Sequence, residues 1–454
     1  NLLEFLEGKR STAGLKRTFV YHDGTVYYFN DTKQKDFSQK ETGTPDYSDL
    51  PLKKYLSVIE IANPMHRLWS DGRWNKLTLA HGCYWGKCTF CDISLDYIKR
   101  YEPNTAKLIC DRIETIIAQT GERGFHFVDE AAPPALMKEL ALEILRRKLV
   151  ISWWTNIRFE KSFTSDLCIL LRESGCIAVS GGLEVASDRL LKLIDKGVTV
   201  EQVTKVAANL THAGIMVHAY LMHGFPTQTA QETIDSMEVV RQLFEAGVLQ
   251  SGFWHRFAMT AHSPVGINPQ AFNVRHIPNA IPTFANNDLE YLDETGCDHD
   301  AFCDGLRKSL FNYMHGIGFE FSLQEWFDFH VPKTKIPTSH IETIIGAPDA
   351  RTIRADNKIV WLGTEPVARK TIKGKKEKTE LQFAGKKADF TVSFGIKEAE
   401  WLQRVLPELI PGHAEPMTIS RMEKSFEENG LEHFQVLLHG KSFQVLRENG
   451  LVII

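Results

Sequence analysis

The sequence is poor in the features that mark secreted, membrane-spanning or strongly charged proteins. Eight cysteines in 454 residues are too few for a disulfide scaffold. No apolar run approaches the roughly 20 residues that cross a bilayer, and the N-terminus lacks a basic-then-apolar signal pattern. The formal net charge of −4 gives no global attraction to nucleic acid or to an anionic membrane. These absences predict a cytoplasmic protein without a membrane partner.

A lysine-rich segment, residues 369–387, is the strongest local basic feature. It contains few aromatic residues, whereas sites for single-stranded nucleic acid combine basic groups with stacking rings. We therefore expect a solvated hairpin here, and nucleic acid is not an expected partner.

The chain is long enough to bury a large core and to divide into several domains. Residues 17–30 predict a hairpin that turns at Asp23-Gly24. We see no internal repeat. The predicted parts are an N-terminal lead-in or linker (1–75), an α/β domain (76–264), a helical and loop extension (265–339) and an accessory C-terminal domain (340–454).

Between residues 76 and 264, short apolar runs alternate with amphipathic segments, which is typical of parallel βα units. The predicted strands are Leu77–Ala80, Phe125–Val128, Val150–Thr155, Ile177–Ser180, Met216–Met222 and Phe253–Met259. The predicted helices are Thr105–Gln119, Pro133–Lys148, Thr164–Glu173, Ser187–Asp195, Thr199–Ala213 and Thr229–Ala246. Thr199 with Gln202 resembles a capping box. Six such units form either an open doubly wound sheet or a partial barrel, and functional groups gather where the strands end.

The remaining residues predict a small α+β region. A loop rich in Asn and Pro leads to a helix over about 299–316, and residues 340–395 read as short strands and turns. Two helices, Lys397–Leu409 and Thr418–Asn429, precede a predicted hairpin, His433–Ile454, that turns at Gly440. This order is similar to a winged-helix module.

Three cysteines crowd into one loop after the first strand, in the segment HGCYWGKCTFCD of residues 81–92. Cysteine thiolates hold iron–sulfur clusters, and close spacing lets one loop wrap a cluster. Three ligands, Cys83, Cys88 and Cys91, leave one iron open for a small chelating molecule. The alternative is a structural zinc site, which needs a fourth ligand from His81 or a distant residue.

This pattern resembles the radical S-adenosylmethionine (SAM) superfamily, whose three-cysteine motif follows the first strand of a partial (β/α)6 barrel. The resemblance spans about 76–264 and implies a 4Fe–4S cluster that cleaves SAM reductively to start radical chemistry. It also implies that Phe90, just before the third cysteine, lies against the adenine of SAM. The first gap here holds four residues where the family usually has three. Gly86 can absorb the extra residue, since glycine adopts backbone angles that other residues avoid.

The resemblance continues at the later strand ends. It implies that Asp129 and Glu130 bind the SAM amino group and that Arg158 contacts SAM. Glu184, in Gly181-Gly-Leu-Glu, is similar to a Gly-x-Glu-Ser segment of members that carry cobalamin or transfer methylthio groups. Gly224 and Pro226 match a Gly-x-Pro-x-Glu-Thr turn of that subgroup, with Gln228 for Glu.

Each of these features also has a structural reading. Asp129 and Glu130 are equally expected at a solvated helix N-terminus, and Glu184 as a helix cap. No catalytic residue is assigned, although Cys297 and Cys303 remain candidate thiols. The histidines near the strand ends, each more often structural than catalytic, are His126, His218, His223, His255 and His262.

Further partners follow from the resemblance. Residues 44–55 resemble the linker that joins a cobalamin domain to the barrel in cobalamin-dependent members, so cobalamin is a possible third cofactor and methyl transfer a possible reaction. Cluster reduction implies an external electron donor of the flavodoxin or ferredoxin type. Two other functions stay open: a zinc-stabilised protein that binds peptide or RNA, and an inactive barrel that only binds SAM.

Overall fold

The computed structural model describes residues 2–54, 74–278, 287–348, 352–373, 376–385, 388–414 and 416–454. The chain divides into two compact units, Asn1–Thr44 and Pro45–Ile454. Two segments discussed above are described only in part. Tyr55 of the linker lies outside the described residues, as do residues 374, 375, 386 and 387 of the lysine-rich segment. No described helix has the length and apolar character needed to cross a membrane.

The first unit is built around the predicted hairpin. Strands β1 (Thr18–His22) and β2 (Thr25–Phe29) pair antiparallel. The turn residues Asp23 and Gly24 both have positive φ, 49° and 76°, as a type I′ turn requires. The predicted hairpin is therefore confirmed. The same unit contains α1 (Leu2–Leu6) and the 3-10 turn η1 (Thr12–Gly14).

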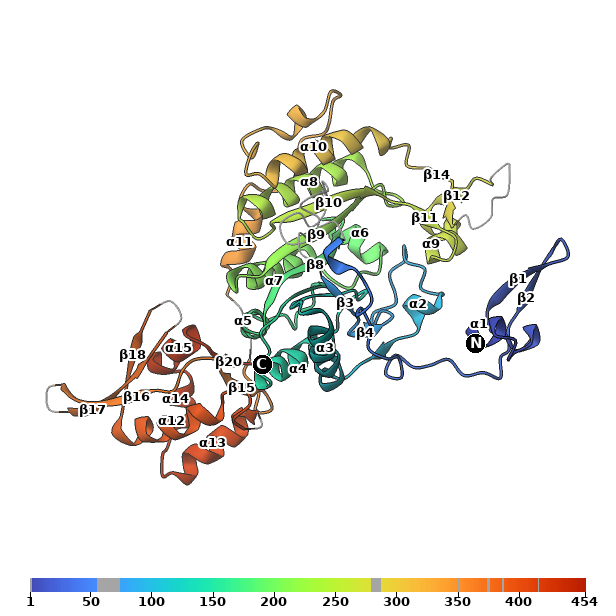
Figure 1. The fold of residues 1–454 in the computed structure, drawn as a ribbon. Coiled ribbons are helices and arrows are strands. Elements are labelled where there is room, and N and C mark those ends of the chain that lie inside the picture. The colour runs from blue at the N-terminus through green and yellow to red at the C-terminus, as the bar shows by residue number, and fades with distance from the viewer. Residues whose placement is uncertain are drawn as a thin grey trace. The chain divides into compact units, whose positions relative to one another are not determined.

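The second unit contains a six-stranded parallel sheet in the order β10-β9-β8-β7-β6-β3 (Figure 1). Its strands are β3 (Asn75–Leu77), β6 (Gly124–Phe127), β7 (Ser152–Ile157), β8 (Cys176–Glu184), β9 (Met216–His223) and β10 (Ser251–Arg256). Within the described residues β3 and β10 lie at opposite edges, so the barrel is not closed. The predicted α/β fold, a partial barrel of six units, is confirmed.

Helices connect the strands, with bounds within two residues of the prediction. They are α3 (Ala106–Thr120), α4 (Pro134–Arg146), α5 (Ser165–Glu173), α6 (Asp188–Leu193), α7 (Val200–His212) and α8 (Ala230–Glu245). Hydroxyl groups of Thr105, Thr164, Ser187, Thr199 and Thr229 each accept a backbone N–H of the first helical turn. The predicted capping box at Thr199 is only half formed, because the Gln202 amide donates to Phe159 O instead.

The first predicted strand is split in two. After β3 the chain turns away from the sheet, and β4 (Ala80–His81) pairs antiparallel with β5 (Glu102–Pro103), beyond α2 (Asp96–Lys99). The N–H groups of Leu79 and Ala80 donate to the Asp129 carboxylate and are unavailable to the parallel ladder. This departure positions the cysteine loop, residues 82–92, above the strand ends.

The extension after β10 is more structured than predicted. Its elements are β11 (Met259–Thr260), α9 (Pro264–Ile267), η4 (Pro269–Phe272), β12 (Val274–His276), β13 (Asp288–Leu289), β14 (Tyr291–Asp293), η5 (Asp300–Phe302), α10 (Cys303–Tyr313) and η6 (Leu323–Trp326). The expectation of only strands and turns over 340–395 is wrong at its start. Helix α11 (His340–Gly346) stands there and packs against α7 and α8.

The C-terminal region contains two antiparallel three-stranded sheets, β19-β15-β20 and β16-β17-β18. Its elements are β15 (Lys358–Trp361), β16 (Val367–Lys373), β17 (Lys376–Phe383), β18 (Phe390–Phe394), α12 (Ile396–Glu408), β19 (Met417–Thr418), α13 (Ile419–Glu428), α14 (Phe434–Leu438), α15 (Lys441–Glu448) and β20 (Leu451–Ile453). Unit 2 also includes η2 (Leu52–Lys54).

The predicted hairpin His433–Ile454 is wrong, because α14 and α15 occupy most of it. The buried residues Phe434, Leu437 and Leu438 recur at the three- and four-residue spacing of a helix and not at the alternation of a strand. The winged-helix interpretation depended on this hairpin, so the structure does not support it. The division at 75, 264 and 339 stays a prediction.

Candidate functional site

The cysteine loop is tied to its surroundings by backbone hydrogen bonds. Cys83 N–H donates to Ile98 O at 2.9 Å, and Thr89 N–H donates to Ile194 O at 2.8 Å. Gly86 has φ of +58°, so the residue that lengthens the first gap takes the left-handed conformation that glycine allows. The loop is thus held in one shape by α2 on one side and by the end of α6 on the other.

The loop covers a cavity of about 310 Å³, which we call the cysteine-loop cavity. All three predicted metal ligands, Cys83, Cys88 and Cys91, line it. Four further predicted residues line it as well: Phe90, Glu130, Arg158 and Glu184. Phe90 belongs to the cysteine loop itself. The other three come from the loop after β6 and from the ends of β7 and β8, as expected at the carboxyl ends of parallel strands.

All three thiols line the cavity, and those of Cys88 and Cys91 are close enough to share a hydrogen bond. Within the part of the chain that is described, no three His, Cys, Asp or Glu side chains are placed to bind a single metal ion. A zinc ion needs its ligands around one centre, whereas a 4Fe–4S cluster binds each thiolate to a different iron. The iron and zinc content of the purified protein therefore distinguishes the two kinds of site.

Cys88 is the most buried thiol of the loop. A hydrogen bond with Cys91 and the cations of Lys196 and Arg158 lower the pKa of Cys88 to about 7, against the effect of burial. The thiolate is the form that binds metal, so this environment prepares Cys88 to act as a ligand.

Arg158 is bound within the protein by all three of its side-chain nitrogens. Its Nε donates to Glu160 at 2.9 Å, Nη2 donates to Lys196 O, and Nη1 lies 3.9 Å from the Cys88 sulfur. The guanidinium also lies over the ring of Trp85, 4.3 Å from its centroid. Arg158 therefore reaches the cavity from beside a cysteine ligand.

Glu184 and Lys196 form a buried ion pair in the same cavity, with Lys196 Nζ 2.6 Å from Glu184 Oε1. Burial favours the neutral amine, but the Glu184 carboxylate and the nearby Cys88 raise the pKa of Lys196 above its ordinary value. Glu184 has φ of +59°, an unusual conformation for a residue other than glycine. The backbone is thus strained where the pair enters the cavity.

The two predicted carboxylates after β6 separate. Asp129 is 1% exposed, and its two oxygens accept the N–H groups of Leu79 and Ala80 at 3.0 and 2.7 Å. Burial raises its pKa to about 7. Asp129 therefore shapes the start of the cysteine loop, while Glu130 lines the cavity.

Gly224 and Pro226 lie in the buried turn after β9 and do not line the cysteine-loop cavity. The Gln228 amide oxygen accepts the N–H groups of Gly224 and Phe225 at 2.7 and 3.2 Å. Arg256 donates to Gly224 O at 2.7 Å. Side chains of the protein itself therefore satisfy the backbone hydrogen-bonding groups of this turn.

Several lining residues were not among the predicted site residues, notably Asn156, Ser180, Lys196, Tyr220 and His255. For Asn156, Ser180 and Tyr220, the register of neighbouring strands is the signal. Ser180 pairs with Asn156 and Gly182 pairs with Tyr220, so these residues lie side by side on neighbouring strands. Of the histidines noted near the strand ends, only His255 lines this cavity.

The two candidate thiols outside the loop lie elsewhere. Cys303 Sγ is 3.7 Å from His223 Nε2, and burial lowers the pKa of that histidine to about 4. Burial raises the pKa of both Cys297 and Cys303. Neither thiol lines the cysteine-loop cavity.

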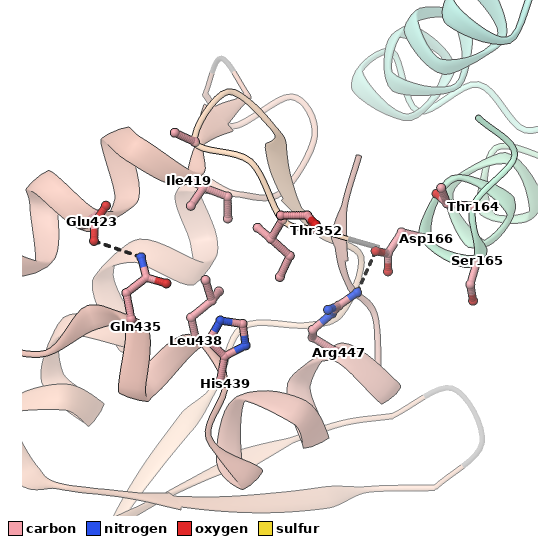
Figure 2. A pocket seen from close by; sticks show the side chains of 12 residues that line it. Thr164, Ser165, Asp166, Thr352, Ile419, Glu423, Gln435, Leu438, His439 and Arg447 are labelled. Atoms are coloured by element: carbon pink, nitrogen blue, oxygen red, sulfur yellow. Dashed lines mark hydrogen bonds and ion pairs between the residues drawn. The ribbon is translucent and has the colours of Figure 1, made fainter. Parts of the chain in front are cut away.

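A second cavity of about 490 Å³, the α5 cavity, lies between the N-terminus of α5 and the C-terminal region (Figure 2). Arg447 donates to Asp166 at 2.7 Å across it, and Gln435 donates to Glu423 at 3.1 Å. Thr164, Ser165 and His439 also line it. It contains no thiol.

Two curated proteins match part of this chain in sequence. The "Uncharacterized methyltransferase PH0819" of Pyrococcus horikoshii is 27% identical over 208 residues, 45% of this chain and 42% of the relative. The "Anaerobic magnesium-protoporphyrin IX monomethyl ester cyclase" of Rubrivivax gelatinosus is 27% identical over 202 residues, 44% of this chain and 34% of the relative. The matched part is less than half the length of either relative.

Among solved structures, a similar one is the cobalamin-dependent S-adenosylmethionine radical enzyme OxsB with aqua-cobalamin and S-adenosylmethionine bound. It is 14% identical with a TM-score of 0.47, over 69% of this chain and 48% of that chain. The sequence pattern of the Radical SAM superfamily matches residues 77–240, the segment that contains the three cysteines and five of the six parallel strands in whole or in part. Residues 77–240 therefore form a radical SAM domain within this chain.

Proposed function

We propose that this chain uses a 4Fe–4S cluster to cleave SAM reductively and so begins radical chemistry on a further substrate. The observation that carries the proposal is one cavity, at the ends of parallel strands, that is lined by Cys83, Cys88 and Cys91 together. These thiols fit the ligand set of a cluster with one open iron.

The protein's residues divide the work around that cavity. Cys83, Cys88 and Cys91 hold the cluster, which supplies the electron that splits the carbon–sulfur bond of SAM. Glu130, which lines the cavity, is placed to accept hydrogen bonds from the SAM amino group. Phe90 presents a ring for the adenine.

The reaction that follows is proposed as methyl transfer or a related modification. The two curated relatives are named as a methyltransferase and a cyclase, so the shared segment supports a common radical start and not one product. The likeness of residues 44–55 to a linker supports cobalamin as a further cofactor. An external donor of the flavodoxin or ferredoxin type would supply the electron.

The test is anaerobic reconstitution of the full chain with iron and sulfide, followed by addition of SAM and dithionite. We expect a cluster spectrum that changes on adding SAM, and 5′-deoxyadenosine as a product. The Cys83→Ala/Cys88→Ala/Cys91→Ala variant is the negative control.

Two results count against the proposal. A cluster that binds SAM but never forms 5′-deoxyadenosine under reduction would leave an inactive SAM-binding barrel. A protein that binds one zinc and no iron would instead favour the zinc-stabilised binding protein.

A further inference from the structure

Arg158 was expected to contact SAM, but its surroundings indicate another role. Its side chain is 4% exposed, and its three nitrogens are used by Glu160, Lys196 O and the Cys88 sulfur. The Nη1 to Cys88 Sγ distance of 3.9 Å is that of an N–H···S hydrogen bond. The guanidinium is therefore directed at a cluster ligand.

Neighbouring groups hold the guanidinium in this position. Trp85 provides a ring face 4.3 Å away, and its indole N–H donates to Asp195 O at 2.8 Å. Gly197 allows the close approach, since a Cβ there would lie 2.3 Å from the Trp85 ring. Trp85 is thus fixed on one side of Arg158 and Cys88 on the other.

A fixed cation beside a cysteine sulfur affects the two redox states of a cluster unequally. Reduction adds one negative charge, so a nearby positive charge and an N–H···S hydrogen bond stabilise the reduced state more than the oxidised state. Arg158 is buried, so solvent screens it little. Glu160 offsets part of its charge at 2.9 Å, whereas the N–H group directed at the Cys88 sulfur stays in place.

We propose that Arg158 is a positioning residue for the cluster, which raises its reduction potential through the contact with Cys88 and does not serve as a ligand for SAM. This inference rests on the proposed function, because it needs the cluster to be bound. It goes further by assigning how this chain makes the cluster easier to reduce for an external donor.

The experiment measures the midpoint potential of the reconstituted full chain by redox titration followed by electron paramagnetic resonance, with and without SAM. For Arg158→Met we expect about a tenfold smaller ratio of reduced to oxidised cluster at a fixed potential, which is a shift of about 59 mV to more negative values for one electron. SAM affinity, measured by the change in the cluster spectrum, should change less than threefold.

Three variants separate the causes. Lys87→Met removes a cation of the same loop that also lies over the Trp85 ring, at 4.8 Å. Because Lys87 is exposed and its charge is screened by solvent, this change should shift the potential much less than Arg158→Met does. The double variant Arg158→Met/Glu160→Gln keeps the net charge constant, and it should still show a more negative potential because the N–H···S bond is lost. Arg158→Lys, which keeps the charge, should shift the potential less than Arg158→Met, and it serves if the methionine variant fails to fold.

The outcomes are distinguishable. An unchanged potential in all Arg158 variants that bind a cluster, or a loss of SAM affinity at constant potential, overturns the inference and leaves the proposed function standing. Failure of the wild-type chain to bind iron and sulfide rejects the proposed function itself.

Discussion

The cysteine-loop cavity and the α5 cavity are both lined by an ion pair, yet the two cavities are built differently. In the first, loops after consecutive strands bring together thiols, an aromatic ring and a buried ion pair. In the second, Asp166 of the barrel and Arg447 of the C-terminal region meet from positions 281 residues apart. The α5 cavity is the larger of the two, but it has no thiol that could hold an iron–sulfur cluster.

The comparison shows that charge pairs serve different purposes in the two places. The Glu184–Lys196 pair is buried beside the thiols of the cysteine loop, whereas the Arg447–Asp166 pair joins the C-terminal region to the barrel. Disrupting the Glu184–Lys196 pair should therefore lower both the stability of the protein and its cluster content. Disrupting the Arg447–Asp166 pair should lower stability alone.

The largest effect is expected for Lys196→Met. This change leaves the Glu184 carboxylate buried without its cation, and breaking a buried pair in this way costs about 3–5 kcal/mol. Chemical denaturation of the cluster-free protein measures the loss. The double variant Lys196→Met/Glu184→Gln should recover part of it, and additive losses in the double variant would show that the two side chains do not interact.

A smaller effect is expected for Arg447→Met. The change removes a charge-assisted hydrogen bond to Asp166 and should lower the free energy of unfolding by about 1.5–3 kcal/mol. Faster hydrogen exchange over 434–454 would locate the change at the C-terminal region. Cluster content and SAM binding should stay at wild-type levels, and a loss of either would contradict the separation of the two cavities.

The smallest effect is expected at Glu143, a carboxylate on α4 near the C-terminal region. Hydrogen bonds from Arg146 and Arg147 lower its pKa to about 2. Its contribution to stability is therefore complete above the ordinary value of 4.5 and is lost as the pH falls through about 2. Arg146 is half exposed, and a glutamine keeps an oxygen to which the more buried Arg147 can donate, so Glu143→Gln should cost only about 1 kcal/mol at neutral pH. Urea unfolding from pH 7 to pH 2 tests this, and a difference that grows toward low pH would contradict it.

The barrel was predictable from sequence because each βα unit carries its own signals. Thr105, Thr164 and Thr229 start helices through local hydrogen bonds that the sequence alone reveals. The cysteine loop was predictable for a similar reason, since its three thiols are neighbours along the chain.

What was missed depends on contacts between distant residues. The role of Asp129 follows from hydrogen bonds to backbone groups 49 and 50 positions earlier, which no spacing indicates. The Lys196 side chain enters the cavity because the loop after α6 folds back toward Glu184. The helices α14 and α15 were mistaken for a hairpin because the turn at Gly440 was given more weight than the helical spacing of Phe434, Leu437 and Leu438.

The most direct measurement is the iron and acid-labile sulfide content of the oxygen-protected full chain after reconstitution, beside that of Cys83→Ala/Cys88→Ala/Cys91→Ala and of Cys297→Ala/Cys303→Ala. The account predicts about four irons and four sulfides for the wild type and for the second variant, and almost none for the first. Equal iron and sulfide in all three proteins, or a wild-type chain that holds none, would contradict the claim that this loop binds a cluster.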